Sequence, residues 1–379
     1  MTSETAHSDF ERHDELAMGT EGIGRVEDQR FTLRDFVLTN GTTMPEATIV
    51  YETYGRLAPH GTNAVLITHG YTASHHAAER NPSNGDQPGF WDGLIGPGKA
   101  IDTDRLFVVA SNMLGSSYGS TNAASINPAA GEPYGPDFPA ITIRDIVAAQ
   151  KRLLDSLGVR HLVAVAGPSY GGYQAFQWAV AYPDFVDAIV PVNTAPWASV
   201  TTDKKLTELA ARFASDLEWH GGRYHGKGPG SYGAKTALTE IRIETLKRYG
   251  MDANLTPRYP DRVEREAAIR EAAARWASHW DAHSLLILRR ALLGFDCRPE
   301  LAKIKAKVLY VLCRSDALFP PRIAPAIMQA LAAACVESRY FELDSDPGHS
   351  SSGPDHAKWS PMLREFLAPL VARAESSPL

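Results

Sequence analysis

The chain has 379 residues, a length that suits one large α/β domain with an insertion, or two domains. Its formal net charge of −6 argues against a dedicated nucleic-acid-binding protein. The 3 cysteines are too few for a disulfide framework and do not have the spacing of a zinc site.

The N-terminal residues 1–25 are expected to form a flexible arm. Their polar composition lacks the apolar segment of a signal peptide. The sequence also contains no apolar run of about 18 residues, the length that a transmembrane helix needs. These patterns predict a cytoplasmic protein that does not bind membranes.

Short β-branched and apolar runs alternate with loops at residues 48–51, 64–68 and 106–110. A helix with one apolar face is predicted from about residue 143 to 157, with Thr142 and Asp145 placed as a capping box. A strand at 162–166, a helix at 171–181 and a strand at 188–192 follow. This alternation predicts a mostly parallel sheet flanked by helices.

The pattern changes after residue 197. Helices are predicted at 205–217, 236–248 and 263–293, the last of them long or broken, with no convincing strand between them. Strands return at 307–313 and 339–343, with helices near 322–335 and 356–372. The sequence therefore predicts an α/β core of residues 26–197 and 299–379, covered by a helical lid of residues 198–298.

The segment 167–171 (GPSYG) has the pattern G-x-S-x-G between a predicted strand and a predicted helix. This context is typical of the nucleophile turn of α/β-hydrolases, in which a strained turn exposes the serine at the carboxyl edge of the sheet. Flanking glycines remove the Cβ atoms that would clash there. Ser169 is the predicted nucleophile.

A serine nucleophile needs a base, and chain order in this fold is serine, acid, histidine. Asp316 follows the strand at 307–313 and is the predicted acid. His349 follows the strand at 339–343 and is the predicted base. Two other acids and one other histidine are the alternatives: Asp344 and Asp346 are favoured as turn residues, and His356 as a helix-start surface residue.

Two backbone N–H groups are needed to stabilise the oxyanion. The N–H of Tyr170, directly after the nucleophile, is the first candidate. The N–H of Tyr71, in the loop that follows the strand at 64–68, is the second. Gly70, Thr72 and Ser350 are expected to line the substrate pocket, and no metal or organic cofactor is implied.

The loops between the strands resemble the homoserine O-acetyltransferase family. The resemblance rests on residues 63–66 (NAVL), 69–74 (HGYTAS), 115–121 (GSSYGST), 125–128 (SINP), 133–139 (PYGPDFP), 141–145 (ITIRD), 182–184 (YPD) and 280–284 (WDAHS). It implies an α/β-hydrolase fold with a helical lid, through which members usually dimerise. It also implies transfer of acetyl from acetyl-CoA to serine and then to the hydroxyl of homoserine, with Ser169, Asp316 and His349 in the catalytic positions.

The sequence departs from that family at two positions. The transferases typically carry Asp after the catalytic histidine, to hold the amino group of homoserine, and Ser350 takes that place. They also carry an Arg at the start of the lid, to hold the carboxylate. Aligning the Asp-Pro that follows this Arg on Asp216 puts Ala210 at the Arg position and Leu217 at the proline. Pro168 and Tyr170 make the nucleophile turn bulkier as well.

Loss of both counter-charges would remove selectivity for homoserine, because each charged contact contributes about 1.5–3 kcal/mol. The sequence therefore favours a serine esterase that hydrolyses small, acetate-type esters through an acyl-serine intermediate. The alternative is an acetyl-CoA-dependent O-acetyltransferase acting on homoserine or a related alcohol. A third class, ligand receptors with little turnover, is disfavoured by the complete set of Ser, Asp and His.

Overall fold

The computed structural model describes residues 24–198, 201–226 and 233–376. The expected N-terminal arm therefore lies almost entirely outside the described residues. Within the described ranges, every helix is too short or too polar to cross a bilayer.

The main sheet has eight strands in the order β1-β2-β8-β3-β11-β12-β13-β14. The strands are β1 (Gln29–Val37), β2 (Thr43–Tyr54), β3 (Ala64–Thr68), β8 (Phe107–Ser111), β11 (Leu162–Pro168), β12 (Ala188–Val192), β13 (Lys307–Cys313) and β14 (Ser338–Leu343). From β8 to β14 all neighbours are parallel, whereas β1 and β2 add antiparallel pairs at one edge. The predicted mostly parallel sheet is confirmed.

Short strand pairs lie in the loops. They are β4 (Arg80–Asn81) with β5 (Gln87–Pro88), β6 (Ile95–Gly96) with β7 (Ile101–Asp102), and β9 (Ile126–Asn127) with β10 (Glu132–Pro133). The helices of the described residues, apart from short 3-10 turns, are α2 (Ile143–Ser156), α3 (Tyr170–Ala181), α4 (Asp203–Ala214), α5 (Lys235–Arg248), α6 (Met251–Leu255), α7 (Arg262–His279), α8 (Ala282–Ala291), α9 (Ala324–Ala333) and α10 (Ser360–Ser376).

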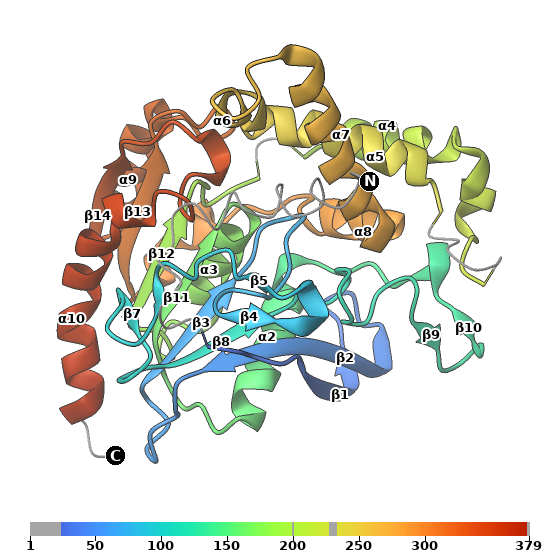
Figure 1. Ribbon diagram of the computed structural model, residues 1–379. Coiled ribbons are helices and arrows are strands. Elements are labelled where there is room, and N and C mark those ends of the chain that lie inside the picture. The colour runs from blue at the N-terminus through green and yellow to red at the C-terminus, as the bar shows by residue number, and fades with distance from the viewer. Residues whose placement is uncertain (1–23, 199–200, 227–232, 377–379) are drawn as a thin grey trace.

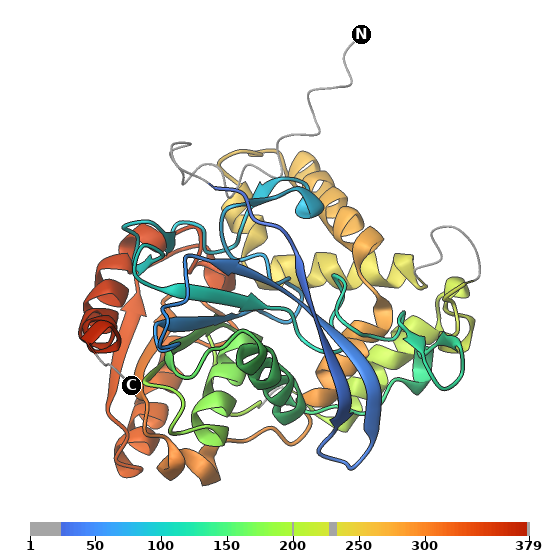
Figure 2. The same cartoon turned by 90° about the horizontal axis from the view of Figure 1, so that it is seen from below.

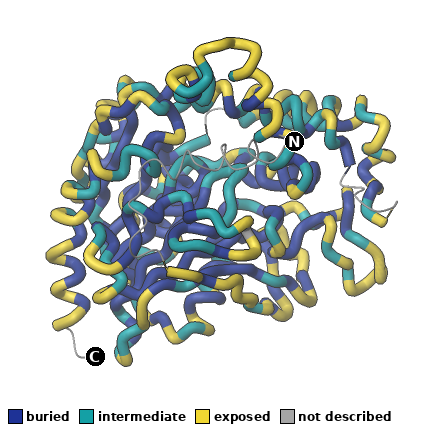
Figure 3. The backbone as a smooth tube through the Cα atoms, viewed as in Figure 1, coloured by how far each residue is buried: buried dark blue, intermediate teal, exposed yellow. Residues whose placement is uncertain are grey.

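Helices cover both faces of the sheet. Buried side chains of α2, α3 and α9 pack in one apolar cluster, and those of α10 pack in another, with the strands contributing to both. The central strands β3, β8 and β12 are buried along their whole length, in line with the buried interior of the molecule (Figure 3). Helix α2 begins as predicted, because Thr142 and Asp145 form a reciprocal capping box.

Helices α4 to α8 all fall between β12 and β13 in the chain and lie together on one side of the sheet (Figures 1 and 2). The predicted helix over 263–293 is broken. Helix α7 ends at His279, and the carboxylate of Asp281 then caps α8 by accepting the N–H of His283. The break lets α8 turn back toward the core, where Ile287 and Leu288 join the cluster that contains α2 and α3. The exact division into core and lid stays a prediction.

The antiparallel hairpin β1–β2 was not predicted beyond residues 48–51. Strand β1 is mostly exposed and polar, with only Leu33 and Phe36 buried, so it has no continuous apolar run. It forms because β2 offers it a free edge with a register of eight residue pairs.

Candidate active site

Ser169 lies at the sharp turn between β11 and α3. Its φ of 54° and ψ of −115° are conformations that residues with a side chain rarely adopt. Such backbone costs about 1–3 kcal/mol and persists only where the surroundings enforce it. Here the N–H of Ser169 donates to the carbonyl of Val192 on the neighbouring strand, at 2.8 Å. The turn exposes the serine at the carboxyl ends of the parallel strands.

The glycines of this turn are required by a close approach of β3. A Cβ atom at Gly167 would lie 2.1 Å from Oγ1 of Thr68, and one at Gly171 would lie 2.4 Å from the Thr68 carbonyl oxygen. Because the two segments lie so close, the Thr68 hydroxyl donates to the carbonyl of Gly171, at 2.9 Å. The pattern G-x-S-x-G therefore reflects packing against β3 as well as the strained turn.

Asp316 and His349 are brought together by the loops after β13 and β14. Nδ1 of His349 lies 2.8 Å from Oδ2 of Asp316, and both side chains are buried. The other oxygen of Asp316 accepts the N–H of Leu318, at 2.7 Å, which fixes the carboxylate. The alternatives lie elsewhere: Asp344 and Asp346 are exposed and pair with Arg314.

His349 is held by rings on two sides. Phe319 stacks on it at 5.7 Å between ring centroids, and Tyr249 contacts it at 4.8 Å. Its carbonyl accepts the side-chain amide of Asn193, a residue with a φ of 47° that directly follows β12 and was missed from sequence. Among the described residues Nε2 of His349 has no hydrogen-bond partner, Ser169 included. That nitrogen is free to exchange a proton.

The two residues proposed for the oxyanion site lie next to each other. Tyr170 is the first residue of α3, so its N–H has no acceptor within the helix. The rings of Tyr71 and Tyr170 stack at 5.9 Å. A Cβ atom at Gly70 would lie 3.9 Å from the Ser169 Cβ, which places the Gly70–Tyr71 loop beside the nucleophile.

Helix α8 holds both tyrosine side chains through hydrogen bonds. The Tyr71 hydroxyl donates to the carbonyl of Leu285 at 2.5 Å, and the Tyr170 hydroxyl donates to that of Leu288 at 3.0 Å. Burial raises the pKa of both hydroxyls, so they stay protonated and remain donors. The position of the oxyanion loop is thus linked to a helix that is distant in the sequence.

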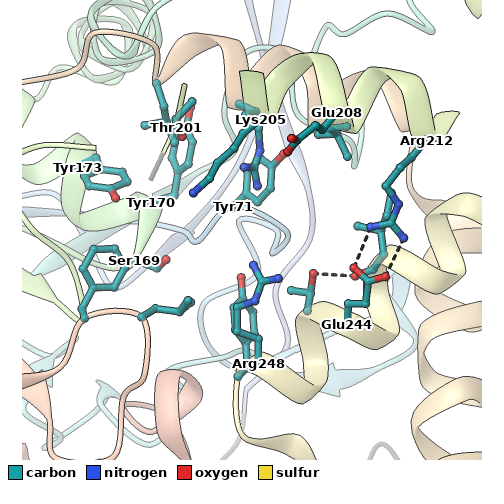
Figure 4. A pocket seen from close by; sticks show the side chains of 18 residues that line it. Tyr71, Ser169, Tyr170, Tyr173, Thr201, Lys205, Glu208, Arg212, Glu244 and Arg248 are labelled. Atoms are coloured by element: carbon teal, nitrogen blue, oxygen red, sulfur yellow. Dashed lines mark hydrogen bonds and ion pairs between the residues drawn. The ribbon is translucent and has the colours of Figure 1, made fainter. Parts of the chain in front are cut away.

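Ser169 opens into a cavity of about 610 Å³ (Figure 4). The lining includes the rings of Tyr71, Tyr170, Tyr173, Tyr249 and Phe319 together with side chains of α4 and α5. A small recess beside it is lined by Thr72, among others. Ser350 is exposed and, like Gly70, lines neither cavity nor recess.

The recess contains a cation that the sequence analysis did not find. Arg242 of α5 donates through Nη1 to the hydroxyl of Thr72 at 2.7 Å, and its guanidinium lies over the ring of Trp276 at 4.8 Å. Its Nε is buried and has no partner among the described residues. Burial lowers the pKa of this arginine, which nevertheless stays charged because its usual value is so high. An uncompensated guanidinium of this kind is suited to an anionic group of a substrate.

The fold and this site define a class of protein. Residues 63–353 match the family model described as alpha/beta hydrolase fold. A homoserine O-acetyltransferase from Moorella thermoacetica is 37% identical over 92% of this chain and 98% of its own length. A homoserine O-succinyltransferase from Halorhodospira halophila is 36% identical over 88% of this chain and 92% of its own length. The chain belongs to the homoserine O-acetyltransferase family of the α/β-hydrolase fold.

Solved structures of two activities resemble the chain almost equally. The crystal structure of esterase E22 has a TM-score of 0.81 and 31% identity, covering 90% of this chain and 100% of that one. A homoserine O-acetyltransferase from Bacillus anthracis has a TM-score of 0.80 and 29% identity, covering 91% of this chain and 98% of that one. The fold therefore does not decide between hydrolysis and transfer.

The prediction of a serine esterase is wrong. Curated relatives that are 34–37% identical across most of the chain are homoserine O-acetyltransferases, which supports the alternative. The error arose at the acceptor site. Ala210 packs against an apolar cluster of α4, α5 and α8, and Asp216 accepts the backbone N–H groups of Glu218 and Ala237. Two cations lie beside the Gly70–Tyr71 loop: Arg242, which donates to Thr72, and Arg289, which lies over the ring of Tyr71 at 5.6 Å.

Proposed function

We propose that this protein transfers an acyl group from an acyl-coenzyme A thioester to the hydroxyl of homoserine or a closely related hydroxy amino acid. The observation that carries the proposal is Arg242, a half-buried cation in the recess next to Tyr71 whose Nε has no hydrogen-bond partner among the described residues. A carboxylate-bearing acceptor would complete its hydrogen bonds. The names of the curated relatives support the same reaction.

In the first half-reaction, Nε2 of His349 takes the proton of Ser169 while the serine oxygen attacks the thioester carbonyl. The N–H groups of Tyr71 and Tyr170 donate to the oxyanion, and Asp316 stabilises the imidazolium. The thioester bond then breaks, and His349 returns the proton to the leaving thiolate. The products are free coenzyme A and an acyl ester on Ser169.

In the second half-reaction, the acceptor hydroxyl takes the place of the thiol. His349 accepts its proton, the oxygen attacks the acyl-serine, and Ser169 leaves with the proton that His349 returns. Arg242 holds the carboxylate of the acceptor, which places the hydroxyl near the acyl group. The exposed hydroxyl of Ser350 supplies no counter-charge for the ammonium of the acceptor.

The test is an assay of thiol release and O-acylhomoserine formation from acetyl-CoA, with and without L-homoserine. We expect homoserine to accelerate thiol release, with one O-acetylhomoserine formed per thiol. Ser169→Ala should abolish both signals. A rate of thiol release that does not depend on any amino acid acceptor would overturn the proposal, as would product formation by Ser169→Ala at the wild-type rate.

A further inference from the structure

Four cations line the cavity that contains Ser169, namely Lys205, Arg212, Arg248 and Arg289, and the acyl-transfer steps use none of them. Arg212 is paired with Glu244, and Arg289 lies over the ring of Tyr71, which leaves Lys205 and Arg248. Lys205 lies in the first half of α4 and Arg248 is the last residue of α5, and both line the cavity that contains Ser169. Figure 4 shows their side chains extending into the cavity from opposite sides. Both residues are exposed, so they lie where the cavity meets solvent.

Neither cation has a carboxylate partner among the residues that the structure describes, whereas their neighbours do. Lys204 lies 3.9 Å from Glu208, and Lys247 lies 4.0 Å from Glu266. On the same wall, Arg212 makes two bonds to Glu244, at 2.8 and 2.9 Å. Charges on α4 and α5 are thus commonly paired, and Lys205 and Arg248 are exceptions that face the cavity.

Two unpaired cations facing one cavity repel each other unless an anion lies between them. The cavity lining holds four cations and two carboxylates, those of Glu208 and Glu244, whereas the protein as a whole has a net charge of −6, so this excess of positive charge is local. It is also separate from Arg242, which lies in the adjoining recess and is not among the residues lining the main cavity. Lys205 and Arg248 therefore lie apart from the cation that we propose for the acceptor carboxylate.

We propose that Lys205 and Arg248 form an anion site for the acyl donor, an inference that rests on the proposed acyl transfer from coenzyme A. The anionic oxygens have two possible sources in a donor: the phosphates of coenzyme A, or the free carboxylate of a dicarboxylic acyl group such as succinyl. Both present oxygens that an ammonium and a guanidinium bind well.

The experiment compares four donors with L-homoserine as acceptor: acetyl-CoA, succinyl-CoA, and the acetyl and succinyl thioesters of N-acetylcysteamine, which lack phosphates. The variants are Lys205→Ala, Arg248→Ala and the double variant. Lys204→Ala and Lys247→Ala are the controls, because each removes the neighbouring cation that is not in the cavity lining.

If the site binds phosphate, each variant lowers kcat/KM for both coenzyme A donors about tenfold relative to the N-acetylcysteamine donors, through KM. If the site binds a carboxylate, the variants lower kcat/KM for both succinyl donors, on coenzyme A and on N-acetylcysteamine. Either pattern supports the anion site. High ionic strength should weaken binding of the donor at this site in the wild type. The two control variants should leave these ratios unchanged.

Three results would overturn the inference: equal losses with all four donors, a change only in the KM for homoserine, or the same loss in the controls. Failure of the proposed function looks different, because wild-type protein would then transfer no acyl group from any donor. In that case calorimetric titration of coenzyme A and of succinate into the wild type and double variant still tests the site. Binding of neither ligand, or equal binding by both proteins, would refute it.

Discussion

Arg242 is a charged side chain that contacts Thr72 and Trp276. Thr72 accepts from its Nη1 and Trp276 lies under its guanidinium, while Trp276 also donates through Nε1 to the carbonyl of Thr72 at 3.1 Å. The arginine, the threonine and the tryptophan thus form one unit next to the oxyanion loop. A substrate carboxylate bound by this arginine would be positioned relative to Tyr71 as well.

Replacing Arg242 by lysine should raise the KM for homoserine by about tenfold to a hundredfold, since a charge-assisted bond contributes about 1.5–3 kcal/mol and an ammonium cannot reproduce the planar donors. The KM for acetyl-CoA should change little. Steady-state kinetics with each substrate varied in turn measures both. Arg270→Lys, at an exposed ion pair of α7 with Glu240, is the control. A larger effect on the KM for acetyl-CoA would contradict the assignment.

At the residue scale, Ser169, Asp316 and His349 were proposed from sequence because each follows a recognisable strand, and carboxyl ends of parallel strands meet at one edge. The structure pairs His349 with Asp316 at 2.8 Å, and the catalytic roles of the three residues stay a prediction. Arg242 could not be found that way. It lies on a helix with several other charged residues, and only the fold shows that its guanidinium enters the recess. Asn193 could have been predicted to lie near the site, since it too directly follows a strand of the predicted sheet.

At the scale of elements, the nucleophile turn depends on how closely β3, β11 and α3 approach one another. A Cβ atom at Gly171 would lie 2.4 Å from the Thr68 carbonyl oxygen, which is backbone and cannot move aside. At Gly70, by contrast, the nearest atom would be 3.8 Å away, an ordinary contact. Two glycines of the same site therefore differ sharply in how much space they have.

Gly171→Ala should lower the free energy of unfolding by about 1–3 kcal/mol, the usual effect of overpacking. Gly70→Ala should lower it much less, and it serves as the matched control for stability. Chemical denaturation of the two variants beside the wild type measures the difference. Equal stability of Gly171→Ala and wild type would show that the approach of β3 does not require glycine there.

The sequence was informative about elements that are buried on both faces or capped by clear signals. Strands β3, β8 and β11 are continuous apolar runs, and α2 has its capping box. It was uninformative about β1, which is stabilised by its pairing with β2 rather than by its own composition. The sequence left open whether the helix over 263–293 is long or broken, because Asp281 caps α8 within a segment of otherwise helical composition.

At the scale of the whole molecule, α8 is joined by hydrogen bonds to the two tyrosines proposed for the oxyanion site. Tyr170 belongs to α3 and Leu288 to α8, so their hydrogen bond joins segments 118 residues apart. The expected dimer through the helices of residues 198–298 stays a prediction, and sedimentation of the full chain would test it. Coupling between α8 and the core can be tested within one chain.

Tyr170→Phe should leave the buried carbonyl of Leu288 without this donor and lower stability by about 1–3 kcal/mol. Tyr310→Phe is a matched control, because its hydroxyl also donates to a buried carbonyl, that of Thr194 at 2.6 Å, entirely within the core. Both variants lose one comparable hydrogen bond. Only Tyr170→Phe should speed hydrogen exchange of the α8 amides by more than the change in global stability explains. In Tyr170→Phe the rate of acyl transfer should also fall, through a lower kcat, because α8 also holds Tyr71. The same exchange rates in both variants would mean that α8 is held by its apolar packing alone.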